Sequence, residues 1–205
     1  MEALGLIVYS DYLCPWCYLG TVRLRRIAEE FGDRLQWEWR SFLLRPQPDP
    51  RRTLEKFRAY TQSWQRPAAE PDAPPFHVWE SDAGPPSHSV PPHMAAKAAA
   101  LLGPDAFRRM HDRLMRAYFT ENRDITDAST LLALWRELEL PEEGFARTTD
   151  PALLQETIAQ HNEALDHGID GVPAVRMQGR DGAVIGAQPV ETFRHWINRH
   201  LSRSA

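Results

Sequence analysis

Two cysteines, Cys14 and Cys17, enclose Pro15 and Trp16 and are the only cysteines in the chain. In helical geometry this spacing places the two sulfurs one turn apart, close enough to form a disulfide. In an intracellular protein such a pair is typical of redox or thiol chemistry rather than of a permanent cross-link. The pair is therefore the first candidate for the functional site.

The elements around the motif determine how its sulfurs are presented. Residues 4–9 form an apolar run of strand type, and residues 18–31 carry apolar side chains at helical spacing. The cysteines are therefore expected at the turn between this strand and this helix, with Pro15 in the first helical position.

The two sulfurs are expected to have different roles. The first turn of a helix has unpaired N–H groups and a partial positive charge, which stabilise a thiolate at Cys14. Cys14 is therefore predicted to lie exposed at the helix start and to act as the nucleophile. Cys17 lies one turn further into the helix and is predicted to be the sheltered, resolving thiol.

Two other interpretations of the motif are weaker. A zinc site would need two more ligands, but the chain has no third cysteine and no closely spaced pair of histidines near the motif. A structural disulfide that closes so short a loop would restrict the unfolded chain very little. No metal ligand is predicted.

The composition limits the partners that are expected. The 205 residues are 42% hydrophobic, which is enough for a buried core, and the formal net charge is -4. The chain has no long block of basic residues, which argues against nucleic acid as its main partner. The short basic cluster 23–26 is predicted to be the solvated face of the first helix. Neither a secretory signal nor an apolar run of membrane-spanning length is visible, so a cytoplasmic protein that does not bind membranes is predicted.

The remaining chain divides into strands at its two ends and helices between them. Residues 35–42, 171–177 and 183–186 are predicted strands, and residues 190–201 a closing helix. Helices are predicted at 53–65, 93–102, 104–119, 127–138, 141–146 and 150–166. The proline-rich segment 67–92 is predicted to be a long loop, either a lid or binding wall or an exposed surface segment.

This order predicts an α/β fold with a discontinuous first domain. Residues 1–48 and 168–205 are expected to share one sheet, and residues 49–167 to form a helical domain inserted between the second and third strands.

Three stretches carry a family resemblance: residues 10–20, which contain the cysteine pair, Gly171-Val172-Pro173, and Gly186-Ala187-Gln188-Pro189. With the helical insertion between them, the chain resembles thioredoxin-fold proteins of the DsbA superfamily, in its FrnE-like branch. The resemblance implies a thioredoxin-like fold and a dithiol-disulfide oxidoreductase of DsbA type. It also implies that Pro173 is a cis-proline facing the cysteine pair.

The implied cis-proline suggests how substrate is held. A cis bond before a strand exposes the backbone of Val172, so that a substrate peptide is able to pair with it beside Cys14. Pro15, Trp16, Val172 and Pro173 are accordingly predicted to contact substrate, with Trp16 exposed as a hydrophobic contact.

Two further residues are candidates for tuning the site. Asp11 either tunes the reactivity of Cys14 or caps the turn. His93 either faces the proline-rich segment as a tuning residue or is a surface or capping histidine.

The resemblance extends to kappa-class glutathione transferases and 2-hydroxychromene-2-carboxylate isomerases, in which a serine stands in the position of Cys14. A glutathione-dependent isomerase or transferase acting on small aromatic or polyketide substrates is therefore one alternative, and a peptide-binding holdase is another. The expected partners are protein or small thiol and disulfide substrates. No cofactor is expected to be bound obligatorily, glutathione is a candidate co-substrate, and the oligomeric state, a homodimer included, stays open.

Overall fold

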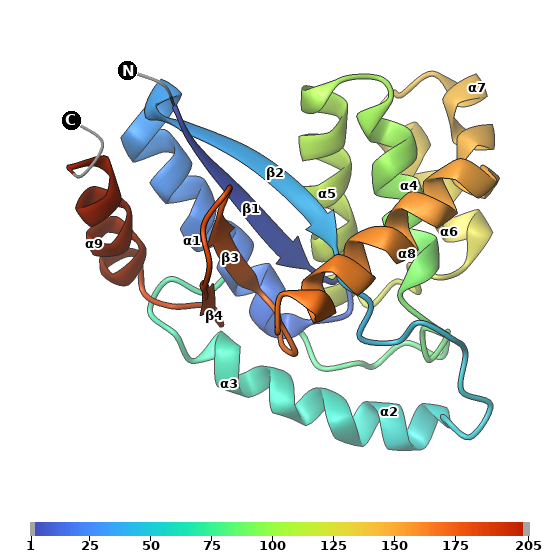
Figure 1. Ribbon diagram of the computed structural model, residues 1–205. Helices are drawn as coiled ribbons and strands as arrows, with labels where there is room; N and C mark the ends of the chain where they lie inside the picture. Colours follow the sequence, from blue (N-terminus) through green and yellow to red (C-terminus); the bar gives the residue numbers. More distant parts are fainter. Residues whose placement is uncertain (1–2, 203–205) are drawn as a thin grey trace.

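A single mixed sheet of four strands forms the base of the fold (Figure 1). The structure is a computed structural model that describes residues 3–202. The strand order is β2-β1-β3-β4. The strands are β1 (Leu4–Ser10), β2 (Leu35–Ser41), β3 (Ala174–Met177) and β4 (Ala183–Ile185). β1 runs parallel to β2 and antiparallel to β3, which runs antiparallel to β4.

Both faces of the central strand β1 are buried. Leu6 and Val8 point to one face, where they pack with side chains of α1 (Pro15–Phe31) and α9 (Val190–Leu201). Ile7 and Tyr9 point to the other face, where α8 (Pro151–Asp166) covers them. Because successive residues of a strand alternate between faces, burial on both sides explains the uninterrupted apolar run in the sequence.

The helical insertion lies between β2 and β3, as predicted. Its helices are α2 (Leu54–Thr61), α3 (Gln65–Ala68), α4 (Val90–Ala100), α5 (Pro104–Phe119), α6 (Ala128–Glu137), α7 (Glu142–Phe145) and α8 (Pro151–Asp166). Figure 1 shows α4 to α8 grouped beside the sheet, and α2 and α3 running along one end of it. The insertion has its own apolar core, which also takes in Cys14 and Cys17. The cysteine pair therefore lies where the sheet domain meets the insertion.

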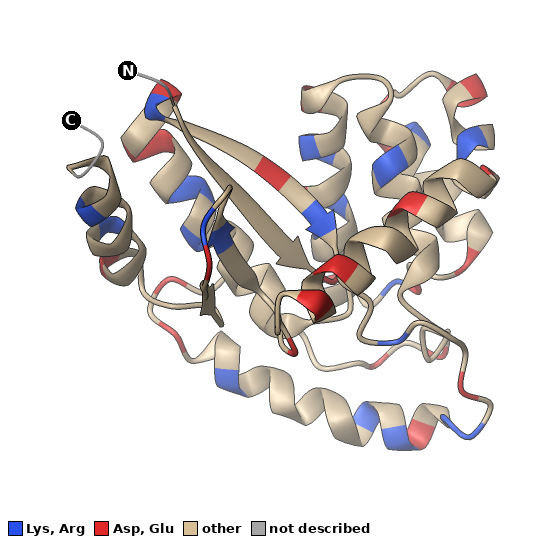
Figure 2. Cartoon of the chain, viewed as in Figure 1, with Lys and Arg blue, Asp and Glu red and all other residues tan. Residues whose placement is uncertain are grey.

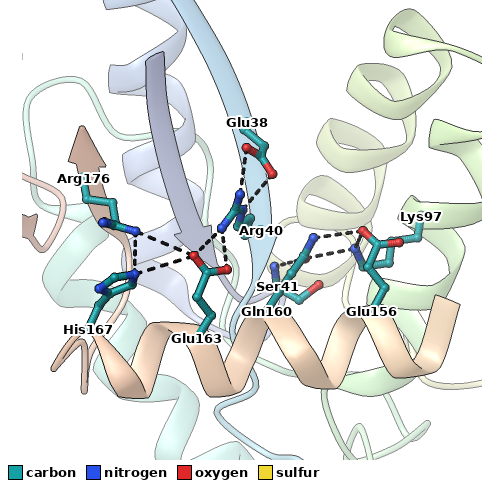
Figure 3. Close-up of polar contacts among 9 residues, drawn as sticks. All are labelled: Glu38, Arg40, Ser41, Lys97, Glu156, Gln160, Glu163, His167 and Arg176. Atoms are coloured by element: carbon teal, nitrogen blue, oxygen red, sulfur yellow. Dashed lines mark hydrogen bonds and ion pairs between the residues drawn. The ribbon is translucent and has the colours of Figure 1, made fainter. Parts of the chain in front are cut away.

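A polar network fixes α8 on the sheet (Figure 3). The carboxylate of Glu163 accepts hydrogen bonds from Arg40 of β2 and lies 3.6 Å from Nη1 of Arg176 on β3. The same Nη1 donates to Nε2 of His167 at 2.7 Å. Further along α8, Oε1 of Gln160 accepts from the amide of Ser41 at 2.8 Å. These contacts position the end of α8 and therefore the segment that leads from it into β3.

The proline-rich segment is packed against the insertion over much of its length. Trp79 is fully buried and its indole N–H donates to the carbonyl of Ala83 at 3.0 Å. Phe76 packs on the same core, and the amide of His77 donates to the carbonyl of Phe119 at 2.8 Å. The predicted alternative of an exposed surface segment is wrong for this part of the loop.

Several predicted boundaries need correction. The helix predicted at 53–65 is divided into α2, a 3₁₀ turn and α3. α4 begins at Val90 inside the predicted loop, because prolines are tolerated in a first helical turn, where no N–H partner is lost. β3 begins only at Ala174, since Pro173 has no N–H to donate to the ladder.

Charges of both signs are interspersed over the helices and strands (Figure 2). The basic cluster of the first helix is only in part the solvated face that was predicted: Arg26 is exposed, but Arg23 and Arg25 are not. Arg23 is 4% exposed and pairs with Glu70 and Asp72 of the proline-rich segment. Arg25 pairs with Asp112. The helix uses these arginines to bind neighbouring segments, which helical periodicity alone does not reveal.

Within residues 3–202, none of the helices combines the length and the apolar character needed to cross a bilayer.

Candidate active site

Cys14 occupies the N-cap position of α1. Its backbone is extended, with φ -95° and ψ 114°, and Pro15 follows as the first helical residue. The carbonyl of Cys14 accepts hydrogen bonds from the amides of Cys17 at 3.0 Å and Tyr18 at 3.3 Å, which begins the helix. The predicted strand-to-helix placement of the motif is therefore confirmed.

The two sulfurs lie in different surroundings. Both cysteines are free thiols. The Cys14 thiol donates to the carbonyl of Val172 at 3.4 Å. The Cys17 sulfur accepts from the backbone amide of Asp11 at 3.5 Å. Burial, followed by the neighbouring Cys14, raises the pKa of the Cys17 thiol well above its usual value. Cys17 is therefore held as a thiol at neutral pH.

The exposure of Cys14 differs from the prediction. Cys14 is only 5% exposed, although the helix start was expected to leave it open to solvent. The residues that cover it come from elsewhere in the chain, since Val172 lies against its sulfur and the core of the insertion packs beside it. Trp16 is 37% exposed, so the surface of the motif is formed by this ring.

Asp11 caps the turn that carries the cysteines. It is fully buried, and its carboxylate accepts hydrogen bonds from the amides of Leu13 at 2.6 Å and Leu44 at 2.8 Å. Its carbonyl accepts from the amide of Cys14 at 3.2 Å. Burial raises the pKa of the Asp11 carboxyl to about 6. The capping role is therefore observed, and a group that ionises close to neutral pH lies within the same turn as both sulfurs.

The Asp11 carboxyl is expected to make stability depend on pH. Its pKa is higher in the folded chain than the ordinary 3.8, so the folded state binds the proton more tightly and loses stability as the pH rises through this range. In urea unfolding between pH 4 and pH 7, we expect wild type to lose about 2 kcal/mol relative to Asp11→Asn, which does not titrate. Asp33→Asn, at an exposed position, is the control: it retains Asp11 and is expected to lose stability with rising pH as wild type does. A wild-type to Asp11→Asn difference that stays constant with pH would contradict this assignment.

His93 is not the surface or capping histidine that was one of its two predicted roles. It is 5% exposed in the first turns of α4, and its Nε2 donates to the carbonyl of Phe42 at 3.1 Å. Nε2 lies 4.0 Å from Oδ2 of Asp11, and its ring is edge-on to Tyr12. Burial lowers the pKa of His93 to about 3, so the ring is neutral beside the capping carboxylate.

His111 of α5 is a residue that the sequence did not single out. Its two ring nitrogens are hydrogen-bonded to the hydroxyls of Tyr12 and Thr21, each at 3.1 Å. Burial lowers the pKa of His111 to about 3. Because Tyr12 and Thr21 flank the cysteine motif, this neutral histidine fixes the motif to the insertion. His111 is 99 residues from Tyr12 and 90 residues from Thr21 in the sequence, so no local sequence pattern could predict these contacts.

The segment containing Val172 and Pro173 lies directly against α1. The Val172–Pro173 peptide bond is cis. A Cβ atom added to Gly20 would lie 2.8 Å from Cγ of Pro173, so only glycine permits this approach. The carbonyl of Pro173 accepts a hydrogen bond from the amide of Gly186 at 2.7 Å. The carbonyl of the next residue, Ala187, accepts a hydrogen bond from Nη1 of Arg23 on α1. α1 therefore positions both the cysteines and the segment opposite them.

No group of three or more His, Cys, Asp or Glu side chains with the arrangement of a metal site occurs within residues 3–202.

Comparison with known proteins identifies the family. Residues 5–198 match the family model of the DSBA-like thioredoxin domain, and the chain belongs to this family. The fold is thus confirmed as thioredoxin-like with a helical insertion between β2 and β3. The family consists of thiol-disulfide oxidoreductases, and Cys14 and Cys17 form its neighbouring CxxC pair in this chain.

Three solved structures illustrate the similarity. A candidate protein disulfide isomerase from Nitrosomonas europaea has a TM-score of 0.82 at 19% identity, with both chains covered completely. The probable DsbA oxidoreductase SCO1869 from Streptomyces coelicolor has a TM-score of 0.77 at 25% identity, over 97% of this chain and 90% of that one. The cytosolic disulfide reductase DsbM from Pseudomonas aeruginosa has a TM-score of 0.76 at 25% identity, over 98% of this chain and all of that one. DsbM has also been solved with GSH.

Proposed function

We propose that this protein is a dithiol-disulfide oxidoreductase in which Cys14 is the nucleophile and Cys17 the resolving thiol. The observation that carries the assignment is the asymmetry of the pair. Cys14 lies at the N-cap position of α1 with its sulfur against Val172, whereas burial keeps Cys17 protonated one turn further into the helix. The sulfur proposed to attack is the one that lies at the helix N-terminus against Val172.

The reaction is a two-step exchange. The Cys14 thiolate attacks one sulfur of a substrate disulfide, whose S–S bond breaks as one thiolate leaves, and a mixed disulfide forms. Cys17 then loses its proton and attacks Sγ of Cys14, and the second substrate thiolate leaves. The substrate takes up two electrons, and Cys14 and Cys17 end as a disulfide. The amide of Asp11, which already donates to Sγ of Cys17, supports the negative charge that develops there.

Substrate is proposed to bind across Pro15, Trp16, Val172 and Pro173. Trp16 offers an exposed ring beside the reacting sulfur. The carbonyl of Val172, which accepts from Cys14, lies where a peptide backbone would run past that sulfur. Asp11 and the neutral His93 are proposed to tune the pair through the turn that they fix.

Protein disulfides and small disulfides such as that of glutathione are the proposed substrates, in the cytoplasm, without an obligatory cofactor. The likeness to a cytosolic disulfide reductase that has been solved with GSH supports this proposal. The FrnE-like branch of the superfamily remains our proposed placement. A glutathione-dependent transferase or isomerase is the second candidate, since glutathione binding is compatible both with disulfide exchange and with transferase or isomerase chemistry.

Reduction of insulin by dithiothreitol tests the function. Wild type is expected to accelerate the precipitation of the insulin B chain, and the double variant Cys14→Ser, Cys17→Ser is expected to fall to the uncatalysed rate. Full activity in the double variant would contradict the proposal and favour a holdase. A glutathione-saturable reaction of an aromatic substrate, with no net thiol oxidation, would favour the transferase.

A further inference from the structure

Two arginines lie near the cysteine pair, and the charge of one of them, Arg45, also acts on Asp11 and Asp49. Within residues 3–202, no carboxylate comes within ion-pair distance of the guanidinium of Arg45 or Arg52, although Arg51 between them in the chain pairs with Asp49 at 3.0 Å. Unpaired guanidinium groups close to a reacting centre are available to bind an anion.

Arg45 is held in place by the turn that carries the site. The amide of the preceding residue, Leu44, donates to the carboxylate of Asp11. The amide of Arg45 donates to Oγ of Ser89 at 3.0 Å, and the Ser89 amide donates to the Arg45 carbonyl at 2.7 Å. Asp11 also binds the amide of Cys14. Arg45 is therefore connected to the nucleophile through a short series of backbone contacts, and its side chain is half-buried.

Arg52 is partly desolvated without a counterion. Its guanidinium lies 4.4 Å from the centre of the Phe57 ring and donates to the carbonyl of Pro86. Burial lowers its pKa. Its guanidinium also interacts with the fully buried hydroxyl of Tyr118. A partly desolvated cation without a carboxylate partner is costly unless an anion joins it.

Tyr60 links these arginines to the reacting sulfur. Its ring stacks with Phe57 at 6.3 Å, and the residue is 44% exposed. Its phenol lies within the range of charge interactions with Cys14, Arg45 and Arg52 together. The two cations, the Tyr60 phenol and the nucleophile therefore share one region of the molecule with the Asp11 carboxyl.

We propose that Arg45 and Arg52, with the exposed Tyr60, bind a carboxylate of a low-molecular-weight disulfide while Cys14 attacks its sulfur. This inference rests on the proposed function and specifies its small-molecule substrate class. The S–S bond breaks and the Cys14–S bond forms as described above, with one thiolate as leaving group. The carboxylate keeps its charge throughout, so its contribution is binding and orientation.

Three disulfides that differ in charge test the site: 3,3'-dithiodipropionate is anionic, bis(2-hydroxyethyl) disulfide is neutral and cystamine is cationic. The rate of oxidation of the reduced protein is measured with each and divided by the rate of the same disulfide with dithiothreitol, which corrects for the leaving thiol. Wild type is expected to prefer the anionic disulfide, less so at high salt. Arg45→Gln and Arg52→Gln are each expected to lower the anionic rate about tenfold and to leave the neutral rate unchanged.

Arg51→Gln is the matched control. This arginine belongs to the same segment but is 88% exposed and paired with Asp49, so its replacement should leave all three rates at the wild-type value. Equal corrected rates of wild type with all three disulfides would overturn the anion site and leave the proposed function intact. An equal loss with the neutral disulfide in the Arg45 and Arg52 variants would also overturn it, because it would show a structural role. No reaction of wild type with any of the three while insulin reduction is still accelerated would overturn this inference alone, whereas loss of both activities would overturn the proposed function itself.

Discussion

Cys17→Ser is expected to accumulate mixed disulfides with substrate, whereas Cys14→Ser is expected to trap nothing. If Cys14 attacks, removal of the resolving thiol stops the reaction at its covalent intermediate, while removal of the nucleophile prevents that intermediate from forming. The buried, protonated state of Cys17 strengthens this expectation, because Cys17 left alone offers little thiolate to any disulfide. Non-reducing mass spectrometry after incubation with glutathione disulfide or a peptide disulfide measures the trapped species.

The control for this experiment is reduction, which should release every trapped adduct. Equal trapping by the two single variants would contradict the assigned roles, because it would show that both sulfurs react directly with substrate. Trapping by neither would remove the covalent mechanism. An adduct with glutathione but never with peptide would favour the glutathione-dependent candidate.

Gly20→Ala is expected to disturb the site although the residue carries no chemistry. Alanine at a helical position normally adds about 1 kcal/mol of stability over glycine. Here the new Cβ would lie 2.8 Å from Cγ of Pro173, so α1 and the segment containing Val172 have to move apart. We expect a net loss of about 1–3 kcal/mol in urea unfolding, typical of overpacking. Displacement of Val172 from Cys14 is expected to slow disulfide exchange about tenfold or more.

Gly171→Ala provides the matched control for this prediction. Gly171 lies in the same segment, but the nearest atom to its added Cβ is Cγ2 of Ile185 at 3.9 Å, an ordinary contact. Its replacement should leave the rate of exchange near wild type. An unchanged rate in Gly20→Ala would show that the close approach to Pro173 does not position the site.

The sequence predicted the elements that local patterns determine. The apolar run of β1, the helical spacing of α1 and the position of Pro15 together placed the cysteines at a strand-to-helix turn, where the structure has them. The order of the four strands along the chain and the helical insertion between them followed from the alternation of residue types along the chain. These patterns depend on residues close together in the sequence, whose periodicity of 3.6 or 2 residues directly indicates a helix or a strand.

The parts that the sequence missed depend on residues far apart in the chain. His111 contacts Tyr12 across 99 residues, and Arg23 binds Ala187 across 164. The burial of Cys14 is likewise produced by Val172, 158 residues away. Arg23 has the spacing of a solvated helical residue, and only the position of Asp72 explains why it is buried. Contacts of this kind are determined by tertiary packing, which overrides local preference.

A redox titration of the Cys14–Cys17 pair tests the central claim most directly. Protein equilibrated in glutathione buffers of increasing oxidised fraction is acid-quenched, the remaining thiols are alkylated, and peptide mass spectrometry identifies the bonds formed. The account predicts a reversible two-electron transition in which both thiols disappear together and a Cys14–Cys17 disulfide appears. A chain that forms only glutathione adducts, or that retains both thiols at every buffer ratio, would contradict a dithiol-disulfide oxidoreductase.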